Sequence, residues 1–391
     1  MMLAMDWFFI KFASFLILPS LYVVNKYTGV AGVFLYGMLV LLLLLAFSKY
    51  FLKKLFFRIT ERRAFWLIVI TLCFLIAIFY LCYPIANSGI FGPGSDRDED
   101  MNISTSALLH GRYPYYVKTY LGNQITHLPG SLFLSAPFVL LGNGAYQNFF
   151  WILLFLIMLK FHLGSLRLAL FLLWLLFILS PALLHELITG GDLIANSLYI
   201  LIFIFLTINT VSNPHSKKWK KVLSAILLGI GLSSRANFLF LLPLIFSALV
   251  QNAGYRKAVG YIMLTGAVFA AVTLPFYLYD PQNFTPLYVQ LMKIKHFDSA
   301  LPFASISIIL IGAITASLLS FRRMNSDCNA LFRNCALVQV SLMASTAILE
   351  TISRGTLEFS FLGYGLSFLF FAAVPLWAQL SRGVIHCKGI E

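Results

Sequence analysis

One acidic run holds the residues best suited to chemistry. Asp96, Asp98, Glu99 and Asp100 place four carboxyl groups within five residues, directly after an apolar stretch. Neighbouring carboxylates disfavour each other's ionisation, so one of them can have a raised pKa and serve as a general base. The alternative is structural: Ser95 or Asp96 would cap a helix whose acidic first turn interacts favourably with the helix dipole. The spacing alone leaves both interpretations open.

Arg235 is the cation best suited to bind a phosphate group. It interrupts an apolar stretch at Ser233-Ser234-Arg235, and a charge in such a segment is functional by default. Its planar guanidinium matches the oxygens of a phosphate. The alternative is a short interfacial turn whose arginine reaches the lipid headgroups. Arg354, which precedes Gly355, is the second candidate.

The elements that must position these residues are membrane-spanning helices. The chain is 60% apolar and only 11% charged, with a mean hydropathy of +0.88, whereas soluble proteins are near half apolar and a quarter charged. Continuous apolar runs, as in Met38–Phe47 and Leu168–Leu179, favour helices over a barrel, in which polarity would alternate. We therefore expect an all-α polytopic membrane protein with about 11–12 spans.

Two of the expected spans are interrupted, one by Gly142-Asn143-Gly144 and one by Ser233-Ser234-Arg235. The expected spans lie at about 7–24, 29–48, 64–85, 131–161 (broken), 166–182, 193–210, 222–234, 236–250, 258–278, 301–320, 334–352 and 359–378.

Lysine and arginine gather in alternate loops, which the positive-inside rule assigns to the cytoplasm. The basic groups are Lys49, Lys53, Lys54, Arg58, Arg62, Arg63, Lys217, Lys218, Lys220, Lys221, Arg256, Lys257, Arg322, Arg323, Arg333, Arg382 and Lys388. The loop 86–130 and most acids then lie on the opposite side. The net charge of +14 therefore indicates contact with membrane lipids rather than with nucleic acid.

Three regions are predicted along the chain. Residues 1–63 form an N-terminal transmembrane hairpin with a basic cytoplasmic loop, 64–290 a core membrane module that includes the loop 86–130, and 291–391 the C-terminal transmembrane helices. The five cysteines show no CxxC spacing, so we expect no disulfide framework and no metal cluster.

Five short motifs occur in a distinctive order within residues 64–290. They are Asp98-Glu99, Ala107–Tyr115 with its Gly-x-x-Pro-Tyr ending, His127–Gly130, Gly190–Asp192 and Leu228–Arg235. In this order they resemble the acidic pair, the A-L-L-x-G-x-x-P-Y stretch, the Y-x-P-G helix start, the G-x-x-D turn and the L-G-L-A-x-x-x-K segment of GT-C fold glycosyltransferases. The resemblance is to the polyprenol-phosphate-sugar-dependent, mannosyltransferase-like branch. His127 replaces an aromatic residue of that pattern, Arg235 replaces a lysine, and the C-terminal third matches only in hydropathy.

The resemblance implies a GT-C-like helix bundle that performs an inverting sugar transfer. An acidic side chain would deprotonate the acceptor hydroxyl, which attacks the anomeric carbon as the lipid phosphate departs. Asp98, Glu99, Asp96 and Asp100 are the expected catalytic acids. The expected substrate-binding residues are Arg235, His127, Tyr113, Tyr115, Arg112, Asp192 and Arg354. Structural alternatives stay open for some of these residues. His127 could be an ordinary loop histidine, the tyrosines could form an interfacial aromatic belt, and Asp192 could cap a helix.

The same resemblance implies the partners and the location. The donor would be a polyprenyl-phosphate-linked sugar, and the acceptor a glycan, a lipid or a protein. No cofactor is expected with certainty, a divalent metal stays open, and no residues are assigned to a metal. The protein would lie in a bacterial plasma membrane with the acidic loop outside the cytoplasm.

A transporter or flippase for a lipid-linked or small polar substrate is the alternative. Broken helices and a buried arginine suit both classes. A transporter, however, is expected to hold ionisable groups near the bilayer midplane in two repeated halves. This chain has no detectable internal repeat and few charges inside its apolar runs, which favours the enzyme.

Overall fold

All regular secondary structure in the described residues is helical. The computed structural model describes residues 2–47, 58–90, 95–299, 301–321 and 327–386. Eight helices in these ranges are long and apolar enough to cross a membrane, or nine if the bent pair α7–α8 is counted as one span. The expectation of an all-α, integral multi-pass membrane protein is therefore confirmed.

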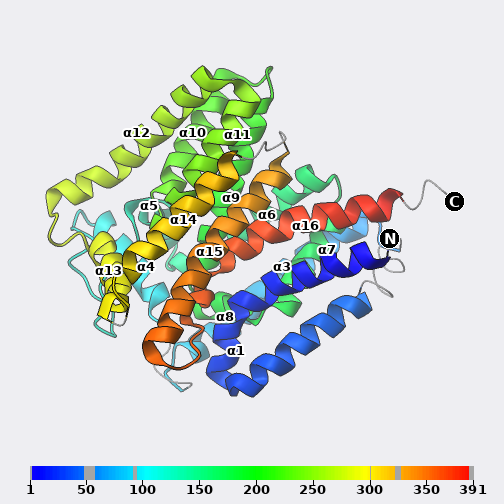
Figure 1. Ribbon diagram of the computed structural model, residues 1–391, viewed down its shortest axis with the longest axis horizontal. Coiled ribbons are helices and arrows are strands. Elements are labelled where there is room, and N and C mark those ends of the chain that lie inside the picture. The colour runs from blue at the N-terminus through cyan, green and yellow to red at the C-terminus, as the bar shows by residue number, and fades with distance from the viewer. Residues whose placement is uncertain (1, 48–57, 91–94, 300, 322–326, 387–391) are drawn as a thin grey trace.

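The helices follow one another with few intervening residues (Figure 1). Their bounds are α1 (Met2–Ala46), α3 (Glu61–Ala86), α4 (Arg97–Leu109), α5 (Pro129–Leu140), η2 (Gly144–Tyr146), α6 (Gln147–Leu163), α7 (Leu166–Leu179), α8 (Pro181–Thr189), α9 (Leu193–Ser212), α10 (Lys218–Leu232), η3 (Ala236–Leu241), α11 (Leu242–Ala253), α12 (Tyr255–Tyr279), α13 (Thr285–Lys295), η4 (His296–Ser299), α14 (Ala304–Phe321), α15 (Cys328–Arg354), η5 (Ser360–Tyr364) and α16 (Leu366–His386).

The count of spans is lower than the 11–12 expected, for two reasons. First, α1 counts as one span although its backbone is non-helical at Gly29, whose φ is 67°, and turns back on itself there. Its two arms, expected as separate spans, form the hairpin drawn in blue in Figure 1, and Tyr36 Oη on one arm donates to Leu16 O on the other. Second, the expected spans 222–234 and 359–378 correspond to α10, with 15 residues, and to the apolar stretch Leu366–Leu380 of α16, both shorter than the roughly 20 residues that a perpendicular span needs.

Both predicted breaks are present. The stretch 131–161 divides into α5 and α6, with Gly142 at a φ of 111° and Asn143 Oδ1 accepting from Ala145 N at 2.9 Å. The stretch 222–250 divides into α10 and the η3–α11 pair at Ser233–Arg235. The span expected at 166–182 is different: it bends by 84° between α7 and α8, where Pro181 opens a new helix.

Helix α9 is the centre of the bundle. Every side chain from Leu193 to Phe205 is buried, and α6, α10, α11 and α16 pack around it. A helix that is apolar on all sides is stable only when surrounded. Asp192, directly before α9, is thereby held at a fixed position in the core.

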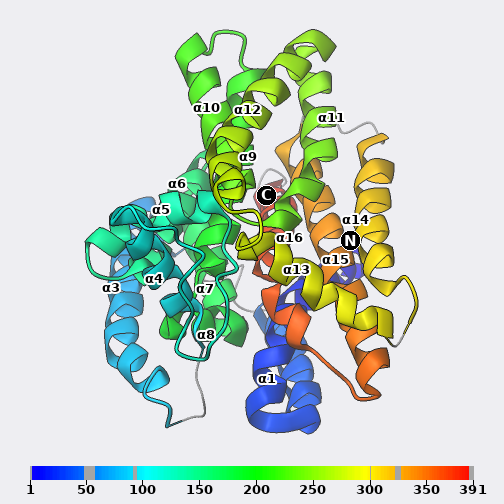
Figure 2. The ribbon, with the colours of Figure 1, turned by 90° about the vertical axis from the view of Figure 1, so that its left-hand side faces the viewer.

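Different elements lie at the two ends of the bundle. Helices α4, α5 and α13 gather at one end, whereas the α9–α10 and α11–α12 turns lie at the other (Figures 1 and 2). The basic residues Lys49, Lys53, Lys54, Arg322, Arg323 and Lys388 lie outside the described residues. The division into regions 1–63, 64–290 and 291–391 stays a prediction, and α1 of the first region packs against α16 of the third.

Candidate functional site

The acidic run forms the first turn of α4. The helix has Asp96 at its N-cap position and ends before Gly111, whose φ is 68°. The capping role expected for Asp96 is wrong in one respect, because its carboxylate makes no hydrogen bond to the first turn. It accepts instead from Thr119 Oγ1 at 2.6 Å and from Asn123 Nδ2 at 2.8 Å.

The four acids have different partners and do not converge on one point. Asp96 binds Thr119 and Asn123, and Glu99 accepts from the backbone N–H of Tyr120 at 2.8 Å. These two acids therefore hold the loop that follows α4 against the helix. Asp98 and Asp100, which are more deeply buried at 8% and 7% exposure, face the helix bundle instead.

Asp98 is bound by the end of α3. Tyr83 Oη donates to its Oδ2 at 2.6 Å, and Asn87 Nδ2 donates to the same oxygen at 3.4 Å. Burial raises the pKa of the Asp98 carboxyl above its ordinary value, while the hydrogen bond from Tyr83 opposes the rise. A desolvated carboxylate with a raised pKa is a stronger base than one in water.

Asp100 begins a chain of charged contacts that crosses four segments. Its Oδ1 lies 3.1 Å from His127 Nδ1, and its Oδ2 accepts from Thr126 Oγ1 at 3.1 Å. His127 Nε2 lies 2.7 Å from Asp192 Oδ2, and Arg235 Nη2 donates to that same oxygen. We call Asp100, His127, Asp192 and Arg235 the ionic chain.

The protonation of His127 follows from its neighbours. Burial alone would lower the pKa of the imidazole, but the carboxylates of Asp100 and Asp192 raise it to about 9. The imidazolium then donates from Nε2 to Asp192 Oδ2, while Nδ1 lies within ion-pair distance of Asp100 Oδ1. Burial likewise would raise the pKa of Asp192, yet Arg235 and His127 hold it well below its ordinary value. Asp192 is therefore an ionised acceptor shared by two cations.

Backbone contacts between two of the predicted motifs bring His127 to Arg235. Gly130 N donates to Ser233 O at 2.9 Å, and Leu128 N donates to Ser234 O at 3.3 Å. A Cβ on Gly130 would lie 2.3 Å from Ile230 O. The Pro-Gly start of α5 therefore fits the end of α10 only because residue 130 has no side chain.

The turn before α9 joins Asp98 to the ionic chain. Gly190 ends α8 with a φ of 74°, and a Cβ there would lie 2.7 Å from Tyr83 Cε2 and 3.3 Å from Asp98 Cβ. At Gly191 a Cβ would lie 2.1 Å from Glu186 Oε1. The Gly190–Asp192 turn thus passes between Asp98 and Glu186. Its backbone approaches their side chains so closely that a side chain at position 190 or 191 would clash.

Three residues of this site were not among the predicted site residues. Arg97 Nη1 donates to Glu186 Oε2 at 2.9 Å, and its guanidinium lies 4.7 Å from the ring centre of Tyr364. Tyr83 binds Asp98. A weak signal existed for two of them: Tyr83 lies four residues before Asn87 at the end of α3, and Glu186 precedes the Gly-Gly turn.

The remaining predicted residues are not brought into the ionic chain. Tyr113 Oη donates to Phe276 O at 2.8 Å, and the Tyr115 ring lies 5.1 Å from that of Phe284, so both anchor the loop to α12 and the segment after it. Arg112 is exposed. Arg354 pairs with Glu350 at 2.9 Å and Glu358 at 3.4 Å. Substrate-binding roles for these four residues stay predictions.

Among the residues that the structure describes, no three His, Cys, Asp or Glu side chains are grouped so as to hold a metal ion. Comparison with known proteins adds nothing to this geometry: no family model, no curated protein and no solved structure matches the chain.

Proposed function

We propose that the protein is an integral membrane glycosyltransferase with a GT-C-like bundle, moving a sugar from a polyprenyl-phosphate donor to an acceptor hydroxyl. The observation that supports it most is the convergence of the acidic run with three of the predicted motifs. Asp100, His127, Asp192 and Arg235 come from α4 and three separate turns, yet they form one continuous set of contacts. Ionisable groups are costly in such surroundings and are retained where they act on a substrate.

Asp98 is the acid best suited to be the base. Asp96 and Glu99 are occupied in holding the loop, and Asp100 is paired with His127. In the proposed reaction Asp98 takes the proton of the acceptor hydroxyl, whose oxygen forms a bond to the anomeric carbon. The bond from that carbon to the phosphate oxygen breaks with inversion, and polyprenyl phosphate leaves with the electron pair.

Arg235 would stabilise the departing phosphate. Its side chain is 14% exposed, and its Nε finds no acceptor among the described residues, nor does Asp192 Oδ1 find a donor. The guanidinium is therefore oriented by Asp192, and a ligand would reach it through the exposed part of its side chain. A preorganised cation of this kind stabilises charge that develops in the transition state. The predicted orientation, with this end outside a bacterial plasma membrane, suits a lipid-linked donor.

One observation favours a transporter as the second candidate. The α7–α8 pair bends by 84°, and Glu186 on α8 is 3% exposed and paired with Arg97. Broken helices with buried charges occur at the binding sites of transporters.

Proteoliposomes that contain the purified protein distinguish the two functions. They would be supplied with polyprenyl-phosphate-linked hexoses labelled in the sugar, together with membrane acceptors. The enzyme releases unlabelled polyprenyl phosphate and forms a new glycosidic bond. Movement of intact labelled donor between leaflets, with no new bond and no released lipid phosphate, would contradict the proposal and support the transporter.

A further inference from the structure

A basic pocket lies at the end of the bundle away from the acidic loop. It has a volume of about 580 Å³ and is formed where α9 and α11 end and where α10 and α12 begin. The acidic loop contacts the opposite end of α12, where Tyr116 binds Asp280, and Arg235 follows the opposite end of α10. At 1.5 Å per residue, the 15 residues of α10 separate the two places by about 22 Å.

The pocket is lined by cations without compensating acids. Lys218 and Lys221 come from α10, and Lys257 comes from α12. The sequence holds no aspartate or glutamate between Asp192 and Asp280. Asp327, the N-cap residue of α15, uses its carboxylate to accept from Asn329 N at 3.0 Å and does not line the pocket. Three lysine side chains therefore line one cavity.

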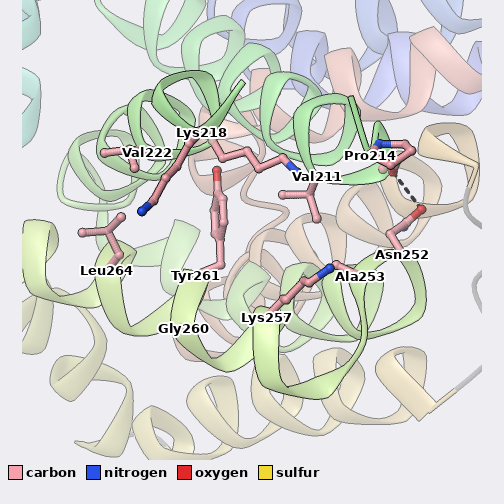
Figure 3. Close-up of a pocket in the computed structure, with 12 residues that line it drawn as sticks. Val211, Pro214, Lys218, Val222, Asn252, Ala253, Lys257, Gly260, Tyr261 and Leu264 are labelled. Atoms are coloured by element: carbon pink, nitrogen blue, oxygen red, sulfur yellow. Dashed lines mark hydrogen bonds between the residues drawn. The ribbon is translucent and has the colours of Figure 1, made fainter. Parts of the chain in front are cut away.

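The rest of the pocket lining has a polar part and an apolar part. Tyr261 stands in the middle of the pocket between α10 and α12 (Figure 3), and its Oη lies 2.5 Å from Ser224 Oγ. A hydrogen bond of 2.8 Å from Ser212 to Asn252 Oδ1 closes one side. Val222 and Leu264 form an apolar part of the lining. A ligand with an anionic head and an apolar tail fits such a division.

The position of the pocket points to the membrane surface. Trp219, next to Lys218, is 57% exposed, and Lys220 Nζ lies 5.7 Å from its ring centre. Exposed tryptophan beside lysine is typical of the level of the lipid headgroups. Leu223 and Met263, one helical step from the apolar lining, are 44% and 69% exposed and continue an apolar surface toward the bilayer. Clusters of lysine at this level attract anionic lipids.

We propose that this pocket binds the phosphate headgroup of an anionic phospholipid, with Lys218, Lys221 and Lys257 around the phosphate and acyl chains along α10 and α12. The proposal is independent of the sugar-transfer reaction, because no residue of the pocket belongs to the ionic chain.

Binding would be measured on the full-length protein in detergent, by native mass spectrometry and by the thermal unfolding midpoint. The probes are phosphatidylglycerol, phosphatidylcholine and inorganic phosphate. We expect saturable binding and stabilisation with phosphatidylglycerol and neither with phosphatidylcholine. Replacing all three lysines by glutamine (K218Q, K221Q, K257Q) should weaken phosphatidylglycerol binding about 100-fold, from the contribution of each lysine near an anionic surface.

A matched control removes the same charge from the same turns but outside the pocket: K217Q, K220Q and R256Q together. It should retain phosphatidylglycerol binding. Equal loss in both triple variants would overturn the proposal, because diffuse surface charge would then explain the attraction. Saturable stabilisation by inorganic phosphate alone, without lipid binding, would also overturn it and make the site one for a free anion.

A second variant tests the pocket without changing any charge. Gly260 lines the pocket, and a Cβ there meets no atom within 4 Å, so Gly260→Phe would place a ring at the cavity. It should abolish lipid binding. Gly266→Phe on the same helix, where a Cβ is equally unopposed, should not. Unchanged binding in Gly260→Phe would contradict the proposed location.

Discussion

Asp192 is the residue on which the site depends most. It is 1% exposed, and its Oδ2 accepts from Arg235 and Asn196 and lies 2.7 Å from His127 Nε2. A buried charge is tolerable only with such partners, and removal of one partner leaves the others uncompensated. The sequence predicted His127, Asp192 and Arg235 as separate substrate-binding residues. It could not predict that they bind one another, because they lie far apart in the chain.

Asp192→Asn should therefore destabilise the protein by about 3–5 kcal/mol, the cost of breaking a buried pair. The double variant Asp192→Asn with Arg235→Gln should recover part of that loss, because no unpaired guanidinium remains. Unfolding midpoints in detergent would measure both. Strict additivity of the two single changes would contradict a direct interaction.

The pKa of His127 predicts a pH dependence of stability. Because it is raised from 6.5 to about 9 in the folded protein, its contribution is fully present below pH 6.5 and is lost as pH rises through about 9, a change of about 3 kcal/mol. The difference in unfolding midpoint between the wild-type protein and His127→Gln should shrink across that window. His110→Gln, at an exposed histidine, serves as the control. A difference that stays constant with pH would show that His127 is neutral.

At the scale of elements, glycine residues allow the turns and helix ends that carry the motifs to pack closely. The breaks at Gly142–Gly144 and Ser233–Arg235 were predictable because glycine and polar residues interrupt long apolar runs. The bend between α7 and α8 was not predictable. Ser180-Pro181 indicates only that a new helix can start there, and it does not indicate the angle between that helix and the preceding one. The docking of Gly130 on Ile230 and Ser233 is a tertiary contact without any local signal.

Gly130→Ala should separate the start of α5 from the end of α10. Its Cβ would lie 2.3 Å from Ile230 O, a backbone atom that cannot rotate away, so we expect destabilisation by about 1–3 kcal/mol. Gly266→Ala meets no atom within 4 Å and should be neutral or slightly stabilising. Thermal unfolding of the two variants compares them directly. Equal midpoints would mean that the contact is not tight.

At the scale of the whole molecule, the composition was sufficient to predict a helical bundle in a membrane. It was not sufficient to count the spans, because α10 has only 15 residues and the apolar run 166–182 bends by 84° between α7 and α8. The acidic loop and the basic pocket lie at opposite ends of α10 and α12, and the assignment of these ends to the two sides of a membrane stays a prediction.

Reporter fusions test the predicted orientation. A reporter at residue 120, in the loop after α4, should be active outside the cytoplasm. One at residue 219, at the start of α10, should be active inside, because lysine-rich segments are retained there. The reverse pattern would place the acidic loop in the cytoplasm, where nucleotide sugars rather than lipid-linked sugars would be the available donors.

The central claim is that Asp98 deprotonates the acceptor, and the transfer rate of Asp98→Asn tests it most directly. Loss of a general base lowers the rate by roughly 100-fold to 10,000-fold, so we expect at least a 100-fold fall with the unfolding midpoint near that of the wild-type protein. Asp327→Asn is the matched control, since asparagine caps a helix as well as aspartate does, and it should retain the full rate. Full transfer activity in Asp98→Asn, with a polyprenyl-phosphate-linked sugar as donor, would contradict the account.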